Sequence, residues 1–318
     1  MKELINFCPI HGYDKEIKAY PGGIEGYFKD SCFDGMELYV YSAEAPDAEY
    51  KNRTVGVHLK YWPYWLDFWR NDTAELAVNH KNSAARREYF GGASGKEEWL
   101  EVIRKNIGAA LTAEPEYLVW HVSHAGLAEI FSYEFKYTDQ DVVNATAEVI
   151  EEVKDCIPRH VKLLFENLWW PGLRLTDPAL AEKFFRRVDM PNAGIMLDTG
   201  HLMNTEINLS SEQEGVAYIL RRLDALGDLR SLIKGIHLNC SLSGKYRAAY
   251  AGRLPDNVDF KEIMEHIVRI DQHRNFSACG LSELIACAAP EYIVHELYYD
   301  DLRELLRRAK QQSVLLKK

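Results

Sequence analysis

Long apolar runs are missing from this 318-residue chain. None approaches the ~18–20 consecutive apolar residues that a membrane-spanning helix needs, so we expect no transmembrane segment. The opening residues, MKELINFCPIHGYDKE, also lack the apolar core and the cleavage site of a secretory signal peptide. These two absences predict a cytoplasmic protein that does not enter a membrane.

Paired cysteines are missing as well. In a chain of this size, scattered cysteines indicate reduced thiols rather than a disulfide framework, which again favours the cytoplasm. No CxxC motif is present, and the six cysteines are Cys8, Cys32, Cys156, Cys240, Cys279 and Cys287.

The third absence is an excess of basic residues. The chain has 38 Lys and Arg against 48 Asp and Glu, a formal net charge of −10. Because nucleic-acid phosphates are held mainly by Lys and Arg, this balance argues against a nucleic-acid partner, although a local basic patch would override it. Apolar residues make up 47% of the chain, which is enough to bury a large core.

No repeat of fixed period occurs, but short β-rich runs alternate with helical patterns along the whole chain. Most of these runs are nearly continuous apolar stretches, as expected for parallel strands that are covered on both faces. The eight runs are Leu4 to Cys8, Gly35 to Val40, Val55 to Leu59, Tyr117 to Val122, Lys162 to Asn167, Ala193 to Asp198, Ile233 to Leu238 and Tyr292 to Leu297.

Eight strands that alternate with helices leave two architectures, an open doubly wound sheet or a closed barrel. No GxGxxG motif follows any run, so the dinucleotide-binding open sheet lacks its phosphate-binding signature. The late runs end in ionisable residues, which in a barrel would meet at one mouth. We therefore predict an α/β fold: a single (β/α)8 TIM barrel over residues 1–318, with an extended loop after strand 3 from Lys60 to Lys96.

Ionisable residues at the ends of strands three to eight predict a metal site. A single histidine at a strand end more often has a structural role. The prediction therefore depends on the recurrence of His, Asp or Glu at the ends of six successive strands. Clustered buried carboxylates repel one another unless a cation lies between them. Carboxylate and imidazole together suit a divalent metal such as Mn, Mg, Co or Zn. The candidates are His58, His121, Glu166, Asp198, His201, His237 and Glu296, among which Glu166, Asp198, His237 and Glu296 supply three carboxylates and one imidazole.

The segments LFEN, GIMLDTGH, GIHLN and VHEL, in this order, resemble the xylose isomerase-like barrel superfamily. That group includes sugar and sugar-phosphate isomerases and epimerases, inosose-processing enzymes and endonuclease IV-type repair enzymes. The resemblance implies that His201 contacts the substrate and that the four metal ligands of the epimerase branch correspond to Glu166, Asp198, His237 and Glu296.

For the endonuclease branch, the resemblance implies that His58, His121 and His201 are additional ligands of a three-zinc cluster. That branch also needs an Asp-x-His pair after the histidine of strand seven. The segment LNCSLSGKYRAAYAGRLPDNVDF, which follows His237, contains no such pair, and Asn239 and Cys240 stand where isomerases commonly have an aspartate. This segment therefore argues against the three-zinc arrangement.

The leading functional prediction is a divalent-metal-dependent sugar or sugar-phosphate isomerase or epimerase. Such an enzyme removes a proton beside a carbonyl, and a divalent cation stabilises the resulting enediolate. Glu166 and Glu296 are the predicted proton-transfer pair. The alternatives are an endonuclease IV-like zinc enzyme that cleaves abasic DNA and a metal-dependent dehydratase of a cyclic polyol of the inosose type.

Further residues are candidates for the pocket. Trp169 and Trp170 follow Glu166 and are predicted to bind substrate together with His58, His121 and His201. Tyr61, Trp62, Tyr64, Trp65, Phe68 and Trp69 follow strand three, and they fit either a sugar-stacking surface or a helix-packing face, because Trp62, Trp65 and Trp69 have helical spacing. The expected partner is a small sugar or polyol, and assembly into a homo-oligomer is left open.

Two smaller groups are more simply structural. Lys245, Arg247 and Arg253 would hold a substrate phosphate or carboxylate if they faced the pocket, but a solvated loop is the simpler interpretation. Asn6 and Glu37, near the ends of early strands, are expected to satisfy hydrogen bonds of the barrel.

Overall fold

The computed structural model describes residues 1–10, 12–250, 252 and 259–317. Its eight strands form a closed, all-parallel barrel in chain order, which β1 and β8 close by pairing with each other. The predicted barrel is thus confirmed, with strand ends within two residues of expectation. The strands are β1 (Lys2–Phe7), β2 (Gly35–Val40), β3 (Thr54–Leu59), β4 (Tyr117–His121), β5 (Lys162–Glu166), β6 (Ala193–Asp198), β7 (Ile233–His237) and β8 (Tyr292–His295).

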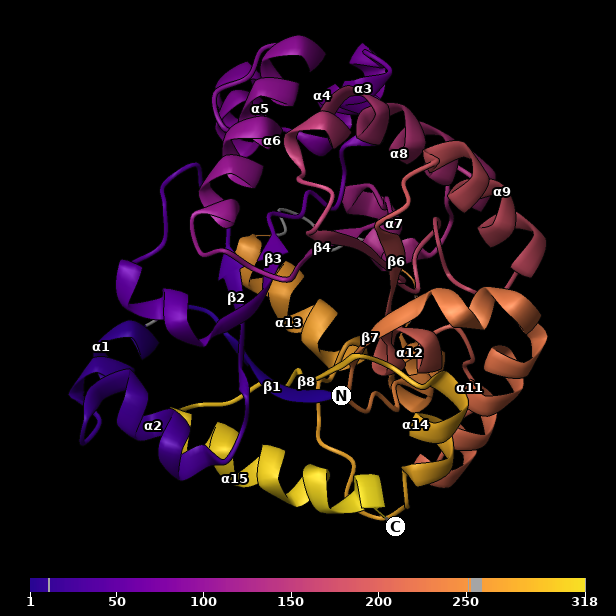
Figure 1. The fold of residues 1–318 in the computed structure, drawn as a ribbon. Helices are drawn as coiled ribbons and strands as arrows, with labels where there is room; N and C mark the ends of the chain where they lie inside the picture. The colour runs from indigo at the N-terminus through magenta and orange to yellow at the C-terminus, as the bar shows by residue number, and fades with distance from the viewer. Residues whose placement is uncertain (11, 251, 253–258, 318) are drawn as a thin grey trace.

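Helices surround the barrel, as Figure 1 shows. Most long ones begin at a side chain that caps the free backbone N–H groups of the first turn, as Thr138 does for α8 and Asp177 for α9. The main helices are α1 (Tyr13–Ala19), α2 (Gly23–Ser31), α6 (Lys96–Leu111), α7 (Leu127–Ser132), α8 (Asp139–Val153), α9 (Pro178–Val188), α10 (Thr199–Met203), α11 (Glu212–Ala225), α12 (Gly244–Ala249), α13 (Phe260–Ile270), α14 (Ser282–Ala288) and α15 (Leu302–Ser313).

The segment after β3 is more ordered than the predicted extended loop. It contains three short helices: α3 (Leu66–Trp69), α4 (Thr73–Asn79) and α5 (Ser83–Tyr89). Trp65 and Phe68 are buried there, and both rings contact the ring of Trp99 on α6. The packing interpretation therefore holds for most of this aromatic cluster, and Trp62 packs on Trp99 in the same way.

The barrel interior is filled below the mouth by buried side chains from six of the strands, among them Tyr117 on β4, Leu164 on β5 and Met196 on β6. Tyr117 needs the space that Gly56 leaves, because a Cβ on Gly56 would lie 2.0 Å from the tyrosine ring. This filled layer closes the floor of the barrel, so ligands can enter only from the mouth.

The pairing register brings the predicted ligands next to each other. His121 on β4 is paired with Glu166 on β5, and Asp198 on β6 is paired with His237 on β7. Because neighbouring strands lie about 4.8 Å apart, side chains that leave paired positions on the same face can share a ligand.

Two other sequence-based expectations bear on the whole chain. No helix within the described residues is both long enough and apolar enough to cross a membrane. All six cysteines, each within the described part of the chain, carry free thiols.

Candidate metal centre

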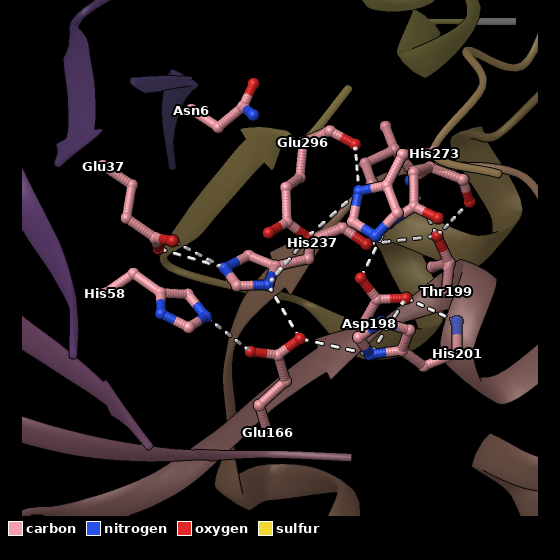
Figure 2. A network of polar contacts seen from close by, with 12 residues as sticks. Asn6, Glu37, His58, Glu166, Asp198, Thr199, His201, His237, His273 and Glu296 are labelled. Carbon is pink, nitrogen blue, oxygen red and sulfur yellow. Dashed lines mark hydrogen bonds and ion pairs between the residues drawn. The ribbon is translucent and has the colours of Figure 1, made fainter. Parts of the chain in front are cut away.

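Four predicted ligands meet at the centre of the barrel mouth. Glu166, Asp198, His237 and Glu296 each offer an atom, and these atoms lie within 4.8 Å of one another. All four side chains are buried. Figure 2 shows His237 lying between Glu166 and Glu296, with its ring directed at both carboxylates. Each residue comes from the end of its strand or directly after it, which is why the closed barrel assembles them.

The ligand atoms of this group suit a cation. His237 Nδ1 lies 3.2 Å from Glu166 Oε1 and 3.1 Å from Glu296 Oε2. None of these three buried atoms has a hydrogen-bond partner among the described residues, and neither does Glu166 Oε2. Buried polar atoms without hydrogen-bond partners are costly, so the convergence of these atoms on one point is the arrangement that a cation would satisfy. Three carboxylates and one imidazole fit a divalent metal.

The electrostatics of the group are dominated by close opposite charges. Burial opposes the ionisation of Glu166, but His121 and His237 outweigh it and hold its pKa well below the usual range. Burial likewise favours neutral His237, yet Glu296 and Glu37 raise its pKa well above the usual value. A divalent cation held by these residues would stabilise the ionised carboxylates in the same way, through its positive charge.

The segment LDTGH has a local reason for its composition. Asp198 caps α10 by accepting a hydrogen bond from the backbone N–H of His201 at 2.5 Å. Asn239 donates to Asp198 Oδ2 at 2.7 Å and so fixes the carboxylate from the other side. A Cβ on Gly200 would lie 1.8 Å from the Asn239 side-chain oxygen, which explains the glycine. The aspartate that isomerases carry after the strand-seven histidine is thus replaced by a residue that orients Asp198.

A second group lies beside the first and shares Glu166 with it. His58, His121 and Glu166 have ligand atoms within 4.8 Å of one another. His121 Nε2 lies 2.8 Å from Glu166 Oε2 and 2.8 Å from His58 Nε2. Two imidazole nitrogens at this distance, facing one carboxylate oxygen, form a second set suited to a metal ion.

A third group shows that the expected absence of an Asp-x-His pair after His237 was wrong. The Asp-x-His pair that the sequence analysis did not find after His237 is present as Asp271 and His273, beyond Phe260. Asp271 Oδ2 lies 2.9 Å from His273 Nε2 and 3.3 Å from His201 Nε2. Asp198, His201 and His273 also form a candidate metal-holding set. The signal was the tripeptide DQH itself, which was missed because it follows a helix instead of a strand.

The orientation of the imidazoles supports this correction. His58, His201 and His273 each place Nδ1 within 3.1 Å of a backbone carbonyl, of Leu59, Asn167 and Glu296 respectively. A carbonyl only accepts, so these Nδ1 atoms carry a proton, and the Nε2 atoms are turned toward the carboxylates and imidazoles of the cluster. Histidines that bind metals usually have their other nitrogen held in this way.

Glu37 is a site residue that the sequence analysis assigned to the barrel hydrogen bonds. It is fully buried, accepts from Tyr117 Oη at 2.8 Å and lies 3.0 Å from His237 Nε2. The His237 Nε2–H therefore points at Glu37, which leaves Nδ1 for the central group. Asn6 has the expected structural role, since it exchanges two hydrogen bonds with the backbone of Leu297.

A cavity of about 690 Å³ opens above the three groups. Trp169 and Trp170 line it together with His58, His121 and His201, so the structure places all five predicted substrate-binding residues at the cavity. Of the aromatic residues after β3, only Tyr61 reaches it. Whether these residues bind substrate stays a prediction.

The cavity has little positive charge. Lys60 is the only lysine or arginine among the described residues that line it. Arg247 instead donates to the backbone carbonyl of Asn204 and lies 4.6 Å from the centre of the Tyr133 ring. Arg253 is outside the described residues. In the described part of the mouth, a basic rim for a phosphate backbone is therefore absent.

Comparisons with known proteins agree with the fold. Solved structures that resemble this chain include AsfvAP:AG (12% identity, TM-score 0.55, covering 99% of this chain and 98% of that one). They also include an L-ribulose 3-epimerase (14%, 0.52, 98% and 94%) and the mannonate dehydratase of Streptococcus suis serotype 2 (13%, 0.51, 100% and 93%). At such identities the likeness shows the fold alone. No curated protein sequence matches the chain.

A family model gives the more specific result. The model described as xylose isomerase-like TIM barrel matches residues 92–282, which is more than half of the chain. This range includes five of the seven predicted ligand residues, all except His58 and Glu296, together with Asp271 and His273. This chain therefore belongs to the xylose isomerase-like TIM barrel family.

Proposed function

We propose that this protein is a divalent-metal-dependent isomerase or epimerase that acts on a small sugar or polyol. The observation that carries the proposal is the central group, in which ligand atoms of Glu166, His237 and Glu296 without hydrogen-bond partners converge and Glu296 lines the cavity. The weakly basic cavity favours a small molecule over a polymer of phosphates. A cytoplasmic location and the oligomeric state stay predictions.

The residues of the central group would divide the work. A divalent cation held by Glu166, Asp198, His237 and Glu296 would stabilise negative charge on substrate oxygens. The carboxylates of Glu166 and Glu296 both lie beside His237 Nδ1 (Figure 2). One of them would take a proton from the substrate carbon and the other would return it. Tyr39 donates a hydrogen bond to Glu296 Oε1, which keeps that carboxylate in place.

Solvent exchange tests this proposal directly. The metal-loaded protein is incubated in deuterium oxide with a panel of ketoses and inososes, and deuterium at the carbon beside the carbonyl is measured by NMR. Glu296→Gln should lower the exchange rate at least 100-fold, whereas Glu214→Gln, a change at an exposed carboxylate on α11, should not. Unchanged exchange in Glu296→Gln on an accepted substrate would refute the proton-transfer assignment.

A second candidate is hydrolysis of a phosphate ester, of which abasic-site cleavage is one case. The pair Asp271 and His273 favours it, because this pair completes the ligand set of the endonuclease branch. Glu166 belongs to two of the three groups. If both of its oxygens hold ions, it is no longer free to accept a proton, so the number of bound ions separates the two candidates.

Metal content and DNA cleavage distinguish these candidates. Elemental analysis of the purified protein should find close to one divalent ion per chain if Glu166 is the base. Three ions per chain, together with cleavage of abasic-site duplex DNA, would reverse the ranking. A dehydratase of a cyclic polyol would use the same base and metal, and mass spectrometry of the product would reveal it by the loss of water.

A further inference from the structure

The walls of the cavity differ in character from its floor. The floor consists of the metal-ligand groups, whereas the walls are mainly aromatic and aliphatic. The wall residues include Tyr41, Pro63, Leu168, Trp169, Trp170, Phe260, Met264, Ile267, Leu297, Tyr298 and Tyr299. At about 690 Å³, the cavity is in the range of pockets that hold drug-sized ligands, about 300–1,000 Å³.

Helix α13 supplies one of these walls. In Figure 1 it crosses the barrel opening, and Phe260, Met264, Ile267 and Asp271 line the cavity at helical spacing. Only His266 and Ile270 of this helix are buried. Ile263, Ile267 and Ile270 of α13 pack in or against the core cluster that contains Trp169 and Trp170. The exposed apolar side chains of the helix, Phe260 and Met264, are directed at the cavity.

Exposed apolar side chains are concentrated at this cavity. Among the described residues, nine large hydrophobic side chains are exposed, and four of them line it: Tyr41, Phe260, Met264 and Tyr298. Phe260 is 77% exposed. Apolar groups that gather at one concave site, while the remaining five are scattered, mark a binding surface.

The polar groups of the walls are partly engaged. Tyr13 donates to the carbonyl of Tyr299 at 2.8 Å, Tyr39 donates to Glu296, and the amide of Asn6 is paired with Leu297. The indole N–H groups of Trp169 and Trp170 are buried without a hydrogen-bond partner among the described residues, so the walls offer a few isolated donors on a surface that is otherwise mainly apolar.

We infer that the substrate joins an oxygen-rich head group, which the metal ligands at the floor receive, to a hydrophobic, ring-containing body that fills the space between α13 and the tryptophans. This inference rests on the proposed metal-dependent function and narrows its substrate class. The substrate is then an aryl- or alicyclic-substituted polyol or hydroxyketone.

Binding of hydroxamates tests the inference without any assay of turnover. Acetohydroxamate, benzohydroxamate and 2-naphthohydroxamate share one metal-binding head and differ only in the body. Calorimetry on the zinc-loaded protein should show that benzohydroxamate binds about 10- to 100-fold more tightly than acetohydroxamate, since an aromatic ring is buried. 2-Naphthohydroxamate should bind at least as tightly as benzohydroxamate.

Variants of α13 locate the effect. The double variant Phe260→Ser/Met264→Ser should lose most of the advantage of benzohydroxamate and should bind acetohydroxamate unchanged. The matched control is Lys261→Ser/Glu265→Ser, which changes the exposed face of the same helix and leaves the net charge as it was. Circular dichroism checks that both variants keep the helical content of the parent.

The outcomes separate this inference from the proposed function. Equal affinities for all three hydroxamates would overturn the inference and leave the metal site intact. Failure of every hydroxamate to bind, with no metal retained, would overturn the proposed function as well. An advantage of the aromatic probes that persists in Phe260→Ser/Met264→Ser would refute the role of α13.

Discussion

At the scale of single residues, the histidines of the mouth show which of their nitrogens are available. His58, His201 and His273 commit Nδ1 to a backbone carbonyl, and His237 directs Nε2 at Glu37. Sequence could predict the ligands at strand ends, because strand ends meet in a barrel. It could not predict the role of Glu37, which lies inside β2 and whose contact with His237 depends on the closure of the barrel.

The role of Glu37 can be tested by removing its charge. Glu37→Gln keeps the shape of the side chain but weakens the carboxylate that orients His237. We expect the affinity for Zn²⁺ to fall about 10- to 100-fold, the usual effect of losing such a partner. Competition with a fluorescent zinc chelator measures it.

The control is an equally conservative change at a buried carboxylate that does not line the cavity. Glu212 accepts hydrogen bonds from the backbone N–H groups of Ser277 and Ala278 and contacts none of the three groups. Glu212→Gln should lower stability without changing zinc affinity. Equal zinc affinities in Glu37→Gln and the parent would show that Glu37 serves only the packing of the barrel.

At the scale of elements, the alternation of strands with helices was predictable from the sequence. The short helices and the loops at the mouth were not. Continuous apolar runs identified all eight strands, because a strand covered on both faces has no polar alternation. The segment after β3 was expected as a loop, since its polar stretch hides the short helices α4 and α5. Asp271 and His273 were missed for a related reason: they occupy a loop that α13 places at the mouth, and no strand pattern points to it.

The connection after β3 is fastened to the connection after β4 by one buried histidine. His124 accepts hydrogen bonds from the backbone N–H groups of Trp65 and Leu66, at 3.2 and 3.1 Å, at the start of α3. Burial, with Lys136 and Arg70 nearby, lowers the pKa of His124 to about 3. The folded protein therefore keeps this imidazole neutral at pH values where the unfolded chain is protonated.

This contact predicts a pH dependence of stability. Between the unfolded pKa of about 6.5 and the folded value, the unfolded state binds one more proton, so the free energy of unfolding falls as the pH falls. The parent should lose about 1.4 kcal/mol per pH unit more than His124→Gln, which keeps an acceptor but does not titrate. Urea unfolding from pH 6 to pH 4, with chelator present throughout, measures both. Parallel pH profiles would contradict the assignment.

At the scale of the whole molecule, the site depends on closure of the sheet. Glu166 and Glu296 are far apart in sequence and belong to β5 and to the residue after β8, yet each lies close to His237. An open sheet would have set these side chains in a row. The barrel could be predicted from the sequence because several strands end in ionisable residues, and a closed barrel brings such ends together at one mouth. Such a cluster of carboxylates is unfavourable unless a cation lies among them.

Removal of metal should therefore destabilise the whole protein. At a metal concentration 100-fold above the dissociation constant, binding adds about 2.7 kcal/mol to stability. We expect chelator to lower the melting temperature of this 318-residue chain by about 4 °C, and added Zn²⁺ or Mn²⁺ to restore it. Calorimetry measures the shift, and Asp198→Asn should respond weakly. Identical melting curves with and without chelator would exclude a structural contribution of metal.

The sharing of carboxylates among the three groups has a consequence for how the protein fills with ions. Glu166 is common to two groups and Asp198 to two. An ion bound in the central group would neutralise the carboxylate charge of Glu166 and Asp198, which the other two groups also need. The same ion would hold both side chains in fixed positions. Successive ions would then bind with different affinities, and a titration would show steps in place of one uniform curve.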